Sequence, residues 1–418
     1  MSKWKHSFYN INLKEEGYKN AKENEYYNIL MGKFAVILKD VDMNNPPAEL
    51  KGFLVPHEVD EVDNYIKRQD ELFNDDLPGS LNLVIAVTMS CNYKCEYCFQ
   101  GSHSANANMT EEVLADTIAY IKNEIDTNSN LKSLGITFFG GEPLLAINTL
   151  KTLSTFCKDY CNEKGIEYHA AIDTNGFFLT KEVSTELKEI GIVRAQIAID
   201  GFEEFYNTTR KAPKESYKRV LNNIDSSELP IVIRVNVTKK NQEEVKQLLR
   251  YLYSLDKVKE GKAKVAVYRV GLNNDDPNYD FTDKEWLEFR DCMKDYIDIV
   301  EPKRLFGLPK SYCIGCSMQK KHNVVIGADG SLYRCDRHCG DSTKTIGTVK
   351  EGINLQSQIE KAFRNSVIDG ECKNCKYLPI CCGDDLCRLN LLEKGKPCEL
   401  VKGKFKQALI NYLTYVRG

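Results

Sequence analysis

Six short runs of apolar residues, many of them β-branched, recur along the middle of the chain. They read LVIAVTM (83–89), LGITFF (134–139), EYHAAID (167–173), VRAQIAI (193–199), IVIRVNV (231–237) and AKVAVYR (263–269). Five stretches with helical spacing of apolar residues lie between them, at 110–127, 147–164, 181–190, 216–226 and 241–255. This alternation predicts βαβ units around a parallel sheet. It fits an α/β fold of the partial (β/α)6 barrel type, with a doubly wound sheet as the alternative.

Unusual polar and glycine-rich segments follow five of the predicted strands at their carboxyl ends. In chain order these segments are CNYKCEYC (91–98), GGEP (140–143), TNG (174–176), DG (200–201) and NVT (236–238). Each of the four without cysteine could serve only as a turn. Parallel α/β folds, however, bind their ligands beyond the carboxyl ends of the strands. All five segments therefore indicate one functional site.

The chain on either side of this alternation has a different character. Residues 1–80 contain a possible hairpin around 26–38 and an amphipathic helix pattern at 57–73. From about residue 303 onward, cysteine-rich loops punctuated by glycine replace the alternation. We therefore predict three domains, at 1–80, 81–302 and 303–418.

Composition excludes several classes of protein. The 418 residues carry a net charge of −3. This charge indicates neither a basic surface that binds nucleic acid nor a polybasic membrane anchor. The sequence shows no signal peptide and no apolar segment long enough to span a membrane, so we expect a cytoplasmic protein. In that compartment thiols stay reduced. The sixteen cysteines, most of them clustered, therefore indicate metal binding.

Cys91, Cys95 and Cys98 crowd three thiols into eight residues. A structural zinc site usually takes four ligands, and disulfides take cysteines in pairs. Three thiolates suit a metal centre that keeps one coordination position free for another ligand. CNYKCEYC with a following aromatic, and then GGEP, TNG and DG at successive strand ends, closely resembles the radical S-adenosylmethionine (SAM) enzymes over residues 83–270.

This resemblance implies a [4Fe–4S] cluster whose open iron binds SAM, with Cys91, Cys95 and Cys98 as the ligands of the other three irons. Reductive cleavage of SAM would give a 5′-deoxyadenosyl radical that takes a hydrogen atom from the substrate. The implied SAM contacts are Gly140, Gly141 and Glu142 at the methionine amino group, Asn175 and Asp200 at the ribose and carboxylate, and Arg210 as a further carboxylate contact. Ala198 stands where relatives often have serine, so one hydroxyl contact is missing.

The cysteine-rich tail resembles the SPASM extension, which carries two auxiliary iron–sulfur clusters. The resemblance assigns the outer cluster to Cys372, Cys375, Cys381 and Cys398, and the inner cluster to Cys316, Cys335 and Cys387. Cys387 is shifted, because Asp385 occupies the position that the family gives to that cysteine. Cys313 is the candidate fourth inner ligand, and an open site is the alternative. Three [4Fe–4S] clusters are thus expected, with zinc knuckles in the tail as the other interpretation.

SPASM enzymes act mostly on peptides and proteins, which leaves two enzymatic hypotheses. The main one is a maturase that installs a crosslink, thioether or carbon–carbon, in a ribosomally made precursor peptide. Residues 1–80 would then form a winged-helix-like element that binds the leader as an added strand. The alternative is an anaerobic sulfatase-maturating enzyme that forms formylglycine, with Asp336 beside Cys335 as the catalytic proton acceptor. Either would need an electron donor such as flavodoxin or ferredoxin. A non-catalytic iron–sulfur sensor or peptide-binding protein is the third interpretation.

Overall fold

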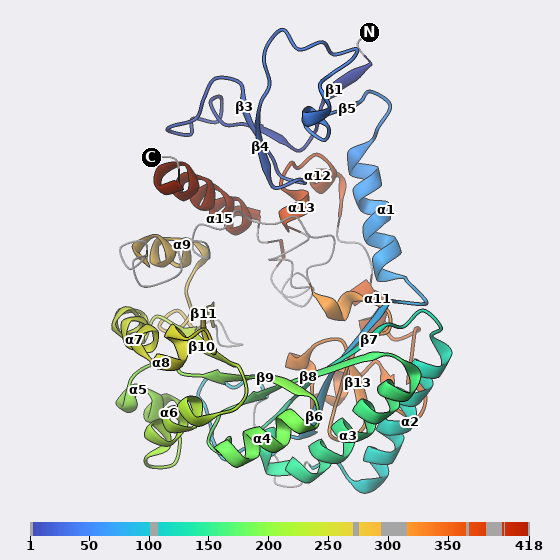
Figure 1. Ribbon diagram of the computed structural model, residues 1–418, viewed down its shortest axis with the longest axis vertical. Coiled ribbons are helices and arrows are strands. Elements are labelled where there is room, and N and C mark those ends of the chain that lie inside the picture. Colours follow the sequence, from blue (N-terminus) through green and yellow to red (C-terminus); the bar gives the residue numbers. More distant parts are fainter. Residues whose placement is uncertain are drawn as a thin grey trace. The chain divides into compact units, whose positions relative to one another are not determined.

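The computed structural model describes residues 3–100, 108–270, 276–293, 316–364, 368–381, 395–396 and 398–416 (Figure 1). Contacts within the chain define two compact units. One unit comprises residues 1–75, 283–320 and 363–418, and the other comprises residues 76–282 and 321–362. The second is called the barrel unit below, and the first the terminal unit.

A ten-stranded sheet forms the centre of the barrel unit, with the order β11-β10-β9-β8-β7-β6-β12-β13-β14-β15. Its strands are β6 (Ser80–Thr88), β7 (Ser133–Gly140), β8 (Glu167–Thr174), β9 (Ile192–Ala198), β10 (Ile231–Val237), β11 (Ala263–Arg269), β12 (Val324–Ile326), β13 (Ser331–Tyr333), β14 (Gly347–Thr348) and β15 (Gly352–Ile353). The strands from β11 to β12 in this order pair in parallel, and the last three pairings are antiparallel. The predicted α/β fold with a parallel sheet is confirmed. Because β6 to β11 are neighbours in chain order, without the reversal of a doubly wound sheet, the barrel interpretation holds.

Helices connect the parallel strands at the predicted places. They are α2 (Glu111–Thr127), α3 (Ile147–Lys164), α4 (Lys181–Glu189), α5 (Glu203–Arg210), α6 (Ser216–Ser226), α7 (Gln242–Ser254) and α8 (Asp256–Lys259). Thr110 and Thr180 cap α2 and α4, and each side chain accepts a hydrogen bond from the backbone N–H three residues on. The sequence pattern missed α5, whose eight residues are too few to show helical periodicity.

The strands bury one face beneath the helices and carry polar residues on the other. Ile197 and Ile233 are fully buried, as two-residue alternation requires of the helix-covered face. Their neighbours Gln196 and Arg234 project from the opposite face and are only partly buried. This opposite face is called the inner face below.

Residues 321–362 belong to the barrel unit because β12 pairs with β6 in parallel, with Val324 opposite Leu83. A buried ion pair supports this extension: both oxygens of Glu360 accept from the guanidinium of Arg334, at 2.6 and 2.7 Å. The predicted boundary at residue 303 assigned this segment to a separate domain. The contacts group residues 321–362 with the sheet instead, because β12 pairs with β6 and the short strands that follow extend the sheet on that side.

The terminal unit combines both ends of the sequence. It contains β1 (Trp4–His6), β2 (Asn10–Asn12), β3 (Glu25–Asn28), β4 (Lys33–Val36), β5 (Leu54–Pro56), α1 (Glu61–Phe73), α9 (Asp283–Cys292), α12 (Gly370–Lys373), α13 (Leu378–Ile380) and α15 (Cys398–Asn411). Helix α11 (Gln358–Arg364) begins in the barrel unit and ends in the terminal unit. β1 pairs with β5, and β2-β3-β4 form a three-stranded antiparallel sheet. The predicted hairpin and helix are confirmed as β3–β4 and α1.

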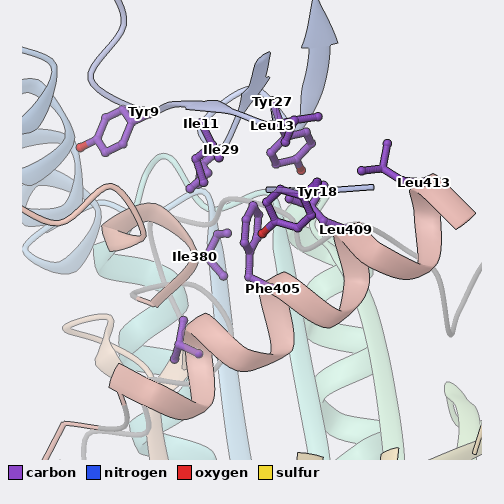
Figure 2. Close-up of a cluster of buried hydrophobic side chains, with 11 residues drawn as sticks. Tyr9, Ile11, Leu13, Tyr18, Tyr27, Ile29, Ile380, Phe405, Leu409 and Leu413 are labelled. Atoms are coloured by element: carbon purple, nitrogen blue, oxygen red, sulfur yellow. The ribbon is translucent and has the colours of Figure 1, made fainter. Parts of the chain in front are cut away.

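Figure 2 shows the core that these two ends share. Tyr27 of β3 lies 5.6 Å from Phe405 of α15 between ring centroids, and Phe34 of β4 stacks on Tyr412 at 4.9 Å. Leu409, Leu413 and Ile380 complete the contact on the C-terminal side. Residues 1–75 therefore do not bury their apolar face alone, and the winged-helix interpretation of them stays a prediction. None of the helices in the described part of the chain has the length and apolar character needed to cross a membrane.

Candidate functional site

The three-cysteine loop follows β6 directly and is held in place by α5. The backbone N–H of Lys94 donates to Arg210 O at 3.1 Å, and that of Glu96 donates to Thr209 O at 2.9 Å. Tyr93, between the first two cysteines, is fully buried, and its backbone N–H donates to Cys91 Sγ at 3.4 Å. The last turn of α5 therefore fixes the loop on which Cys91, Cys95 and Cys98 stand.

The three thiols of this loop are partly exposed. Burial raises the pKa of Cys91 to about 12, and it raises the pKa of Cys95 and Cys98 as well. The Arg210 guanidinium opposes this effect and favours the thiolate form of Cys95 and Cys98. Thiols in such surroundings stay protonated at neutral pH unless a cation compensates the charge, and a bound metal does so.

Gly140 and Gly141 allow the second strand-end segment to lie against the start of the cysteine loop. A Cβ atom on Gly140 would lie 2.0 Å from Thr88 O, and one on Gly141 would lie 2.1 Å from Ser90 O. Gly140 also has φ +132°, which favours glycine. The contact is closed by two backbone hydrogen bonds, from Gly141 N to Thr88 O and from Glu142 N to Ser90 O. The close approach that these glycines permit is thus to the backbone that leads into the cysteines.

Glu142 is fully buried and joins the second and third strand ends. Its Oε1 accepts from Thr174 Oγ1 at 2.7 Å and from Leu144 N at 3.1 Å, and its Oε2 accepts from Asn175 N at 2.7 Å. Burial raises the pKa of Glu142 to about 7, against these hydrogen bonds and the Arg210 charge, which lower it. Glu142 is thereby a positioning residue that carries the TNG turn.

Asn175 connects that turn to the cysteine loop. Its Nδ2 donates to Asn92 Oδ1 at 2.7 Å, and its Oδ1 accepts from Phe177 N. The Nδ2 of Asn92 is buried and has no hydrogen-bond partner. A buried donor without a partner costs free energy. This donor beside Cys91 therefore fits a site in which a bound ligand supplies the hydrogen-bond acceptor.

Asp200 binds three protein donors. Its Oδ2 accepts from Arg210 Nε at 3.0 Å and from the Tyr97 hydroxyl, and its Oδ1 accepts from Asn236 N at 3.0 Å. The pair with Arg210 is almost completely buried, and the Arg210 guanidinium also faces the Tyr206 ring at 5.0 Å. Asp200 thus links the cysteine loop, α5 and β10, and both of its oxygens are already bound to protein groups.

The cysteines assigned to auxiliary clusters are distributed over both units. Cys335 lies in the barrel unit, whereas Cys316, Cys372, Cys375, Cys381 and Cys398 lie in the terminal unit. Cys313 and Cys387 lie outside the described residues. Cys372 and Cys375 share a tight turn, since Cys375 N donates to Cys372 O, and Lys396 Nζ lies 3.3 Å from Cys372 Sγ. The grouping of these cysteines into two clusters stays a prediction.

Asp336 is exposed, and its Oδ1 accepts from Arg337 N at 2.9 Å and lies 3.4 Å from Cys335 Sγ. Its charge reaches the inner face of the barrel. The pKa of Asp173, near the end of β8, is raised to about 6, mainly by burial and further by Asp336. The proposed proton acceptor therefore lies near the inner face of the sheet.

The prediction of a shared site at the carboxyl edge agrees with this geometry. GGEP, TNG and the DG segment are joined to the cysteine loop through Glu142, Asn175 and Asp200. The charged residues of the inner face, Asp173 and Arg234, were missed. Their signal was present in the sequence as polar residues at alternate positions within otherwise apolar strands.

Comparisons with known proteins agree with this architecture. Residues 85–252 match the family described as the radical SAM superfamily. The chain is 28% identical over 382 residues to a cysteine-type anaerobic sulfatase-maturating enzyme of Clostridium novyi. This alignment covers 81% of this chain and 97% of that enzyme. A second such enzyme, from Clostridium perfringens, is 26% identical and is covered completely.

Two solved structures share the fold over about the same span. Native anSMEcpe with bound AdoMet aligns with a TM-score of 0.59 and 22% identity, over 80% of this chain and all of that chain. Streptococcus suis SuiB bound to its precursor peptide SuiA aligns with a TM-score of 0.55 and 16% identity, over 80% of this chain and 77% of that chain.

Proposed function

The chain carries a radical SAM domain and is a radical SAM enzyme, and we propose that it is a maturase that oxidises a cysteine side chain of a peptide or protein to formylglycine. The likeness to cysteine-type sulfatase-maturating enzymes supports this over nearly their full length. The peptide-crosslinking hypothesis, which the sequence first favoured, has weaker support, since the likeness to SuiB is one of fold alone.

The residues of the cysteine loop fit the cofactors that this chemistry needs. Cys91, Cys95 and Cys98 would hold a [4Fe–4S] cluster, which would supply the electron that cleaves SAM. Asn92 Nδ2 offers a buried donor to that cluster or to SAM. Glu142, Asn175 and Asp200 hold the surrounding turns at fixed positions. Pre-organised contacts of this kind orient bound groups without further entropic cost.

Asp336 is the observation on this chain that carries the proposal. Removal of a hydrogen atom from the cysteine Cβ, followed by loss of the thiol proton and of one electron, would give a thioaldehyde. Water would then hydrolyse the thioaldehyde to formylglycine and release hydrogen sulfide. A carboxylate beside Cys335 and near the inner face can accept the proton. An auxiliary cluster held by Cys335 would be the electron acceptor, with a flavodoxin or ferredoxin as the donor for the SAM cluster.

The test is an anaerobic assay with reconstituted enzyme, SAM, dithionite and a cysteine-containing peptide of sulfatase sequence. The proposal expects 5′-deoxyadenosine together with a peptide aldehyde that a hydrazide reagent captures. The same peptide with alanine in place of cysteine is the control and should give no aldehyde. Formation of 5′-deoxyadenosine from SAM without any aldehyde in the cysteine peptide would contradict the formylglycine reaction.

A second candidate is the crosslinking of a precursor peptide. The feature that favours it is the three-stranded sheet of the terminal unit, whose edge strand β4 ends in Val36, 41% exposed and followed closely by Leu38 at 60%. An exposed edge of this kind can accept a leader peptide as an added strand. A crosslinked product loses hydrogen without gaining an aldehyde, so mass analysis with hydrazide capture separates the two reactions.

A further inference from the structure

The inner face of β8 to β11 carries charged side chains that the functions proposed above do not use. Arg234 of β10 stands between Ala198 of β9 and Ala266 of β11, so both neighbours in register are small. Two positions on, towards the carboxyl edge, Asn236 stands beside Tyr268. No bulky side chain therefore flanks Arg234 at its own register position on either neighbouring strand.

Two contacts hold Arg234 in a defined position. Its Nε donates to Asn236 Oδ1 at 2.8 Å, and its guanidinium carbon lies 4.4 Å from the centre of the Tyr268 ring. Among the residues that the structure describes, no carboxylate lies within ion-pair distance of Arg234. Within the described part of the chain, the two Nη groups therefore have no carboxylate partner, and the face on which they lie leaves Tyr268 43% exposed.

We propose that Arg234 binds a carboxylate group of a ligand that enters the barrel. The carboxylate comes from one of two sources, the methionine part of SAM or an acidic group of the peptide substrate, and the inference therefore rests on the proposed function. The planar guanidinium fork matches a carboxylate with two parallel hydrogen bonds. Because Asn236 and Tyr268 already fix the side chain, little conformational entropy is lost on binding.

The acidic residues nearby define where such a ligand carboxylate can bind. Asp173 lies on the same face, and the Arg234 charge lowers its pKa against the larger effect of burial. Asp336 adds a second negative charge near Asp173. An anionic group is repelled at that side and attracted at Arg234, so the two sides of the inner face select one orientation of the ligand.

The first arm of the test measures SAM binding. Isothermal titration calorimetry compares SAM with decarboxylated SAM on the reconstituted wild-type enzyme and on Arg234→Gln. If SAM supplies the carboxylate, the variant loses about tenfold or more in affinity for SAM and keeps its affinity for decarboxylated SAM.

The second arm uses short cysteine-containing peptides that carry one aspartate, each paired with the same peptide carrying asparagine. Fluorescence anisotropy in the presence of SAM measures their binding. If the peptide supplies the carboxylate, wild type prefers the aspartate member of a pair, and Arg234→Gln loses that preference by about tenfold or more. Its binding of the asparagine member stays as in wild type.

Arg219→Gln is the matched control, because Arg219 belongs to helix α6 and not to a strand of the sheet, and its guanidinium also stacks on an aromatic ring, that of Phe177, at 4.1 Å. It should discriminate both pairs of ligands as wild type does. If Arg234→Gln does not fold, Arg234→Lys replaces it, since lysine keeps the charge and removes the fork. The proposal is overturned if Arg234→Gln distinguishes SAM from decarboxylated SAM, and the aspartate peptide from the asparagine peptide, as the wild type does. It is also overturned if the affinity of Arg234→Gln for the two members of each pair falls equally. Absence of SAM cleavage in the wild type would instead refute the proposed function.

Discussion

Asp200 shows how much of this site a single residue can organise. Its carboxylate accepts from Arg210, Tyr97 and the Asn236 backbone, which belong to α5, the cysteine loop and β10. The sequence singled out Asp200 as a direct SAM contact. Because its two oxygens already bind protein donors, we expect Asp200 to position the groups around the predicted SAM site, and its direct contact with SAM stays a prediction.

The first prediction follows from this buried pair. Asp200→Asn leaves the Arg210 charge buried without its counter-charge, and removing one partner of such a pair costs about 3 kcal/mol or more of unfolding free energy. Urea unfolding measures the loss. The control is Glu186→Gln, which breaks the exposed pair with Lys151 and should cost less than about 1 kcal/mol. Equal losses in the two variants would show that the buried pair does not organise the site.

The second prediction concerns Asp336. Asp336→Asn keeps the acceptor oxygen that caps the turn, but it removes the carboxylate that we propose as the base in the oxidation. We expect unchanged 5′-deoxyadenosine formation and a loss of aldehyde product on the order of a hundredfold, the range that general bases supply. Asp341→Asn is the control, because Asp341 caps the next turn in the same way, through Thr343 N. An Asp336→Asn enzyme with wild-type product yield would remove Asp336 from the mechanism.

At the scale of elements, the strand ends decide where the chemistry lies. Parallel strands in chain order bring residues from five distant segments to one edge, and alternation of apolar runs and helices was enough to predict this. The same pattern did not reveal that β12 extends the sheet beside β6, because a strand of three residues is too short to show an alternation of apolar and polar positions. Nor did it reveal Arg234, whose significance depends on the small neighbours Ala198 and Ala266 in register.

The third prediction tests the contact between the second strand end and the cysteine loop. In Gly141→Ala the new Cβ would lie 2.1 Å from Ser90 O, so the backbone of one segment has to shift. We expect the displaced cysteine loop to bind less iron and to cleave SAM at least tenfold more slowly. Gly79→Ala is the control, since its nearest atom, Asn130 O, is 4.0 Å from the Cβ position. Full iron content and activity in Gly141→Ala would mean that the loop tolerates the shift.

The two ends of the chain matter most at the scale of the whole molecule. Residues 1–75 share a core with α15, so a truncation that removes them also exposes Phe405, Leu409 and Leu413. The domain boundaries expected from sequence treated the two ends as independent, because no local pattern reports which distant segments pack together. A test of leader binding therefore needs point variants on β4 and not a deletion.

The last prediction concerns the metal content of the whole chain. If the three cysteine groups each hold a [4Fe–4S] cluster, anaerobically reconstituted enzyme contains about twelve irons and matching sulfide. Replacing Cys91, Cys95 and Cys98 together by alanine removes about four irons and all SAM cleavage, while the remaining clusters stay visible by Mössbauer spectroscopy. The control replaces Cys157 and Cys161, fully buried on α3, by alanine and should leave the iron content unchanged. Stoichiometric zinc in place of iron, or unchanged iron in the triple variant, would contradict the cluster assignment from which the proposed reaction starts.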